Sequence, residues 1–162
     1  MPHLAELDLN FEWSAVSAGA LADALPALTA LTDLDLSSDG DALCVPAIAA
    51  VSRCPQLRSL SLCGFWGSTE WVSALTAALA ACTLLTGLRL IRITSVAGHE
   101  CVNLRRAFRT LSAAQQLGDI TVEHYCSGND GATMLCSVLR PCTALQQLDL
   151  NAFGIRAERD AL

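Results

Sequence analysis

The sequence repeats one short leucine phrase six times, at intervals of 26 to 32 residues. Each copy has the form Leu-x-x-Leu-x-Leu, with Ile and Val in place of two leucines in one copy, and the copies begin at Leu4, Leu31, Leu57, Leu85, Leu117 and Leu145. A fixed period of this length is typical of stacked supersecondary units, each of which completes its core against its neighbours. The repeat therefore constrains the fold more than any other feature of the chain.

The second half of each phrase predicts a short strand with one buried side. Leu34-Asp35-Leu36 and Leu148-Asp149-Leu150 alternate apolar and polar residues with the period of two that half-buried strands show. The predicted strands lie near residues 5–9, 32–36, 58–62, 86–90, 118–122 and 146–150.

The residues ahead of each phrase predict a helix. From the second phrase on, apolar residues stand 10, 6 and 3 positions before the first leucine, as Ala47, Val51 and Cys54 do before Leu57. These offsets place three residues on one stripe of an amphipathic helix. Because strands joined by helical crossovers run parallel, we expect residues 1–162 to form a single α/β domain. Its expected architecture is a solenoid, or horseshoe, with a curved parallel sheet of about six strands and helices on the convex side.

These motifs resemble those of leucine-rich repeat proteins, in particular the ribonuclease-inhibitor-like subclass. The resemblance covers residues 4–150 and includes a Cys-x-x-Leu lead-in at Cys54, Cys82 and Cys142. It departs from the family at the Asn or Cys expected three residues after each phrase, where this chain has Glu12, Asp39, Phe65, Ile93, Tyr125 and Phe153. We interpret the chain as a divergent member with no polar cap at either end. Further repeats or a second subunit are expected to cover the ends.

Net charge and hydropathy exclude several classes of partner. The formal net charge is −6, which disfavours nucleic acid and anionic membrane surfaces. No apolar run reaches the ~20 residues that span a bilayer, and the first residues do not read as a signal peptide. The lack of a signal peptide in these residues, together with cysteines expected to stay reduced, predicts a cytoplasmic location.

Titratable residues give no pattern for chemistry. The eight cysteines include no Cys-x-x-Cys pair. Cys54, Cys82 and Cys142 share one position of the repeat and are interpreted as small, buried, reduced side chains. A disulfide between Cys54 and Cys82 is the alternative. His3, His99 and His124 have no partner at metal-binding or catalytic spacing. We therefore expect no enzymatic activity, no cofactor and no metal.

The residues between the leucines form the candidate binding surface. In a horseshoe they face the concave side, where the charges are expected to be acidic in repeats one and two, basic in three and four, and acidic in five and six. The alternative is an ordinary solvated charge pattern. Exposed aromatic anchors, or else loop caps, are predicted at Phe11, Trp13, Trp66 and Trp71. The predicted partner-binding residues are Glu6, Asp8, Asp33, Asp35, Arg58, Ser61, Arg89, Arg92, Asp119, Thr121, Glu123 and Asp149.

The expected function is a non-catalytic protein–protein interaction module that binds a protein partner on its concave face. Two alternatives follow from the fold by analogy alone. One is a GTPase-activating protein of the leucine-rich repeat type, which is expected to carry regular turn asparagines and an essential arginine on a loop at the rim. The other is a substrate adaptor of a ubiquitin ligase, which usually needs an additional helical module.

Overall fold

A computed structural model of the chain describes residues 3–10, 12–37, 45–64, 69–93, 117–124 and 143–151. Its helical elements are α1 (Ala15–Ala24), the 3-10 turn η1 (Leu25–Ala27), α2 (Val45–Val51) and α3 (Thr69–Ala81). Its strands are β1 (Glu6–Asn10), β2 (Asp33–Ser37), β3 (Ser59–Cys63), β4 (Gly87–Ile93), β5 (Asp119–His124) and β6 (Gln147–Asn151).

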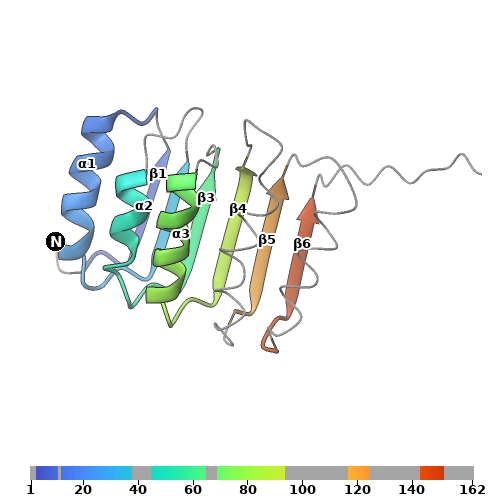
Figure 1. Cartoon of the computed structure of the whole chain (residues 1–162). Coiled ribbons are helices and arrows are strands. Elements are labelled where there is room, and N and C mark those ends of the chain that lie inside the picture. The colour runs from blue at the N-terminus through green and yellow to red at the C-terminus, as the bar shows by residue number, and fades with distance from the viewer. Residues whose placement is uncertain are drawn as a thin grey trace, which may run out of the picture.

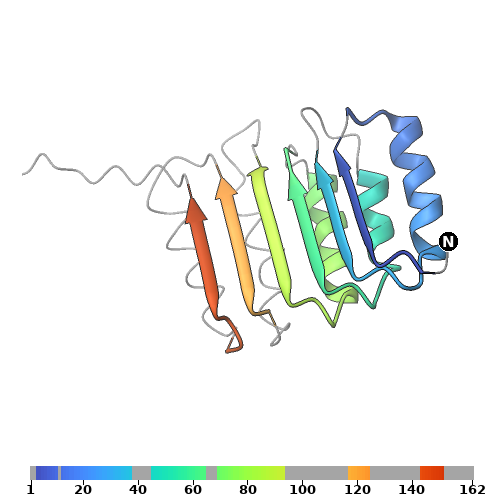
Figure 2. The ribbon, with the colours of Figure 1, turned by 180° about the vertical axis from the view of Figure 1, so that it is seen from behind.

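The strands form one parallel sheet in sequence order, β1-β2-β3-β4-β5-β6. All three described α-helices lie against one face of this sheet (Figure 1). The reverse view shows the other face of the sheet in front of those helices (Figure 2). The predicted α/β class and its six parallel strands are confirmed. We call the side turned away from the helices the open face.

Each strand begins one residue later than the sequence predicts, and the backbone shows why. The carbonyl of Ala5, just before β1, accepts the N–H groups of both Thr32 and Asp33, at 2.8 and 3.0 Å. The same forked contact recurs in every later repeat, at the carbonyls of Thr32, Arg58, Thr86 and Gly118. The residue before each strand is thus held outside the regular ladder, and its bonds join consecutive repeats.

The repeated leucines form the core between sheet and helices. Leu34, Leu36, Leu60 and Leu62 are at most 2% exposed. The helical stripe is also confirmed where it is described, since Ala47, Val51 and Cys54 are fully buried. Figure 1 shows the helices stacked over the strands that carry these leucines.

Of the two predicted alternatives, the exposed anchor is wrong for both tryptophans that the structure describes, whereas the loop cap fits Trp13. Trp13 is 7% exposed, and its indole N–H donates to the carbonyl of Ser37 at 3.0 Å, which ties the loop after β1 to the second repeat. Trp71 is fully buried in the first turns of α3. Phe11 and Trp66 lie outside the described residues.

The described cysteines at the helix–strand junctions confirm the interpretation as small, buried thiols. Cys54 and Cys82 are free, so the alternative disulfide between them is not formed. The Cys54 thiol lies 3.7 Å from the Leu25 carbonyl, and the Cys82 thiol lies 3.5 Å from the carbonyls of Val51 and Cys54. Each thiol therefore donates to carbonyls at or just after the end of the helix in the previous repeat. Burial raises the pKa of both, that of Cys82 to about 11.

Among the described residues, no helix has the length and apolar character that crossing a bilayer requires.

Candidate functional site

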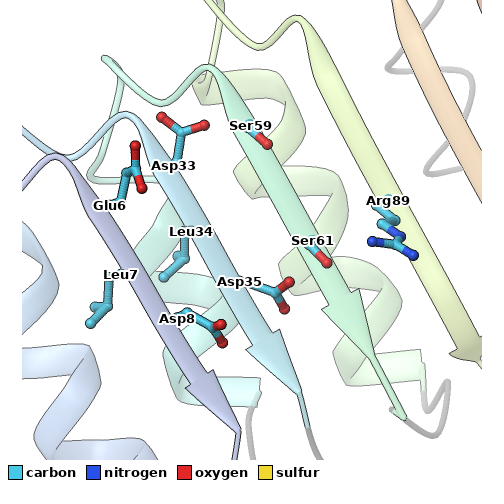
Figure 3. Close-up of a pocket in the computed structure, with 9 residues that line it drawn as sticks. All are labelled: Glu6, Leu7, Asp8, Asp33, Leu34, Asp35, Ser59, Ser61 and Arg89. Carbon is cyan, nitrogen blue, oxygen red and sulfur yellow. The ribbon is translucent and has the colours of Figure 1, made fainter.

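A shallow hollow of about 280 Å³ lies across β1 to β4 on the open face. Figure 3 shows this hollow, with the ribbon of the helices behind the strands. Nine residues line it, namely Glu6, Leu7, Asp8, Asp33, Leu34, Asp35, Ser59, Ser61 and Arg89.

Strand alternation places the polar residues of the hollow. Leu34 and Leu36 point into the core, where they are 2% and 0% exposed. Successive side chains of a strand point to opposite faces, so Asp33 and Asp35 point to the open face. The same alternation applies to Glu6 and Asp8 on β1. We refer to Glu6, Asp8, Asp33 and Asp35 as the acidic quartet.

Two pairs of like charges oppose each other within the acidic quartet. The register of β1 and β2 places Glu6 beside Asp33 and Asp8 beside Asp35. Neighbouring strands are about 4.8 Å apart, and like charges directly opposite one another destabilise a sheet. This face therefore carries concentrated negative charge close to solvent.

Hydrogen bonds from neighbouring hydroxyls orient the two β2 carboxylates. The Thr32 hydroxyl donates to Oδ2 of Asp33 at 2.7 Å, and the Ser37 hydroxyl donates to Oδ1 of Asp35 at 3.2 Å. Both carboxylates are half-buried, whereas those of Glu6 and Asp8 are exposed. The β2 pair is thus the more fixed half of the acidic quartet.

Two neutral serines on β3 separate the acidic quartet from a single arginine on β4. Ser59 and Ser61 on β3 stand in register with Asp33 and Asp35, and Arg89 on β4 stands in register with Ser61. Two strand spacings place the Arg89 backbone roughly 10 Å from that of Asp35. Within the part of the chain that the structure describes, no ion pair joins Arg89 to the acidic quartet.

The structure brings six of the predicted binding residues together in the hollow: Glu6, Asp8, Asp33, Asp35, Ser61 and Arg89. On β5, Asp119 stands in register with Gly87 and Thr121 with Arg89. On β6, Asp149 stands in register with Thr121. Glu123 lies in β5 opposite Ile91, and its side chain is outside the described part.

Of the three arginines predicted to make repeats three and four basic, the described part of the structure places only Arg89 on the open face. Arg58 precedes β3, and Ser59 instead pairs with Asp33 and Gly87. The placement of Arg58 on the open face was wrong by one residue, because Leu60 and Leu62 point into the core and alternation then puts Ser59 and Ser61 on the open face. Arg92 lies between Ile91 and Ile93, where the register with β5 shifts, and its side chain is outside the described part.

Ser59 was missed from the sequence, although a signal for it was present. Aligning the six phrases places Ser59 at the same position as Glu6 and Asp33. The charged residue before it, Arg58, was assigned to the surface in its place. Among the described residues, no group of three or more His, Cys, Asp or Glu side chains is arranged to hold a metal ion.

Comparisons with known proteins identify the fold but no family. No protein-family model matches the chain, and no curated protein matches it. Among solved structures, the tropomodulin C-terminal domain of Caenorhabditis elegans superposes with a TM-score of 0.62 at 13% sequence identity. The match covers 87% of this chain and 85% of that one. At this identity the likeness concerns the fold, and the chain has a leucine-rich-repeat-like α/β fold with a parallel sheet.

Proposed function

We propose that this chain is a non-catalytic protein–protein interaction module that binds a protein partner on the open face of its sheet. In this proposal the domain is a leucine-rich repeat solenoid of the ribonuclease-inhibitor-like subclass, and the open face is its concave side. The observation that carries the proposal is the register of polar and charged side chains across β1 to β4, on the side away from the helices.

The backbone supports such a role because it holds these side chains in fixed positions. Every pair of neighbouring strands is joined by a parallel ladder and by a forked contact at the strand entrance. The leucines beneath the face are buried in β2, β3 and β4 and partly buried in β1, which limits independent movement of the strands. A surface that is ordered before binding loses less conformational entropy when a partner docks.

The chemistry of the face also favours recognition over catalysis. The hollow is shallow and is lined by carboxylates, two serines and one arginine. It holds no histidine or cysteine, and its described hydrogen bonds only orient Asp33 and Asp35. We further propose a cytoplasmic location, since the free thiols of Cys54 and Cys82 accord with a reducing compartment.

Site-specific crosslinking tests the proposal. A photoreactive benzoylphenylalanine is introduced at Ser61, in the centre of the hollow, or at Ala77, an exposed position on α3. Each variant is irradiated in an extract of the cells that make the protein, and the crosslinked chains are identified by mass spectrometry. We expect a discrete protein adduct from Ser61 that is absent from Ala77. Adducts from Ala77 alone would place the binding surface on the helices and contradict the proposal.

A further inference from the structure

The charges of the open face are unevenly distributed across the hollow. The acidic quartet occupies β1 and β2, Ser59 and Ser61 separate it from the next strand, and Arg89 stands on β4 (Figure 3). A partner that docks here therefore meets negative charge at one end of the hollow and positive charge at the other.

The spacing of the acidic quartet suits side chains that carry positive charge. The backbone positions that carry the carboxylates stand about 4.8 Å apart across the strands and roughly 7 Å apart along them, so one basic side chain can reach both members of an opposing pair. A guanidinium or ammonium group between two carboxylates forms charge-assisted hydrogen bonds to both. It also removes the repulsion between Glu6 and Asp33 or between Asp8 and Asp35.

We propose that the open face binds a basic segment of its protein partner. At least two arginine or lysine side chains of that segment lie over the acidic quartet, and an acidic side chain further along pairs with Arg89, roughly 10 Å away. This inference rests on the proposed function and adds the charge pattern of the partner. A second copy of this chain is disfavoured as the occupant, because each copy carries a net charge of −6.

Two synthetic peptides serve as probes of the full-length protein. One is fluorescein-labelled octa-arginine, which tests the acidic quartet. The other is the same peptide with its last two arginines replaced by glutamates, which adds a partner for Arg89. Binding is followed by fluorescence anisotropy at low and high salt, because attraction between exposed charges weakens as salt is added.

Matched variants separate the face from the overall charge. Asp33→Asn with Asp35→Asn removes two charges and leaves side-chain oxygens that can accept from Thr32 and Ser37. Asp23→Asn with Glu70→Gln removes the same charge from exposed positions on α1 and α3, away from the open face. Since each of the two carboxylates can form one ion pair with the peptide, we expect the first double variant to weaken octa-arginine binding roughly tenfold. The second pair should change it by less than about twofold.

The Arg89→Gln variant gives opposite results with the two peptides. Loss of the arginine should tighten octa-arginine binding by about twofold to threefold, because a like charge is removed. It should weaken the mixed peptide by a similar factor, because the glutamates lose their partner. A shift of both peptides in the same direction would overturn the proposed charge pattern.

Three further results would overturn the inference. They are no measurable binding of octa-arginine at low salt, equal losses in the two charge-matched double variants, and self-association of the protein that Asp33→Asn with Asp35→Asn abolishes. The last result would make a second copy the occupant. Failure of the peptides while Ser61 still crosslinks a protein would reject only the basic segment, whereas crosslinking from Ala77 alone would reject the proposed function itself.

Discussion

Neutralising Asp8 is expected to stabilise the free protein, although it weakens the proposed binding surface. Asp8 on β1 stands directly opposite Asp35 on β2, and Asp33 lies on the diagonal. Glu6 is only two residues away along the chain, so its repulsion persists in the unfolded state. The stability change therefore depends mainly on the charges of β2.

The magnitude follows from strand geometry. Unit charges about 4.8 Å apart in water repel by roughly 0.9 kcal/mol, and the diagonal separation of about 8 Å adds roughly 0.5 kcal/mol. Screening at physiological ionic strength, with a Debye length of about 8 Å, reduces the total to roughly 0.7 kcal/mol. For a chain of this length we expect Asp8→Asn to raise the Tm by about 2 °C.

The assay is thermal unfolding followed by circular dichroism at low and high salt. Asp119→Asn is the matched control, because Asp119 occupies a strand position on the same face but stands beside Gly87 and Gln147, which are neutral. The gain for Asp8→Asn should shrink at high salt, and the control should show no gain. A Tm that is unchanged or lowered for Asp8→Asn at low salt would refute the reasoning.

Three other predictions concern single positions elsewhere in the repeats. Charge reversal by Arg89→Glu should reduce crosslinking from Ser61, whereas Arg58→Glu should not, because Arg58 lies outside the hollow. The contribution of Cys82 to stability in urea should be constant below pH 9 and be lost between pH 9 and about 11, because this thiol keeps its proton in the folded state but loses it when unfolded; the fall in stability over this range should be smaller in Cys82→Ser. Gly64→Ala should cost about 1–2 kcal/mol in urea unfolding, because Gly64 has a φ of 83° and its N–H donates to Ile91.

The core was predictable because burial recurs at fixed positions. Leu34, Leu60 and Leu88 occupy one position of the phrase and are all at most 2% exposed, so each copy supports the assignment of the others. Cys54 and Cys82 were assigned to the core in the same way. Trp13 and Trp71 occur at no repeated position, which removed this support, and their burial depends on loop and helix packing that periodicity does not report.

The site was predictable as a face but less well as individual residues. Alternation alone placed Glu6, Asp8, Asp33 and Asp35 on one side of the sheet, and the structure brings them together. Arg58 was assigned to the open face although it stands one residue before the aligned position, which Ser59 occupies, and a difference of one residue reverses the direction of a side chain in a strand. The phrase alignment carries this information, whereas the forked backbone contacts at the strand entrances do not show in the sequence.

Comparison of β2 with β3 bears on why the acidic quartet exists. The two strands are adjacent, parallel and in register, and both bury leucines beneath the open face. At the positions where β2 has Asp33 and Asp35, β3 has Ser59 and Ser61, and the sheet continues without a shift. The fold thus accepts neutral side chains at these positions, and folding alone does not require the opposed carboxylates of β1 and β2. Because their repulsion opposes stability, we infer that their role lies in what the open face binds.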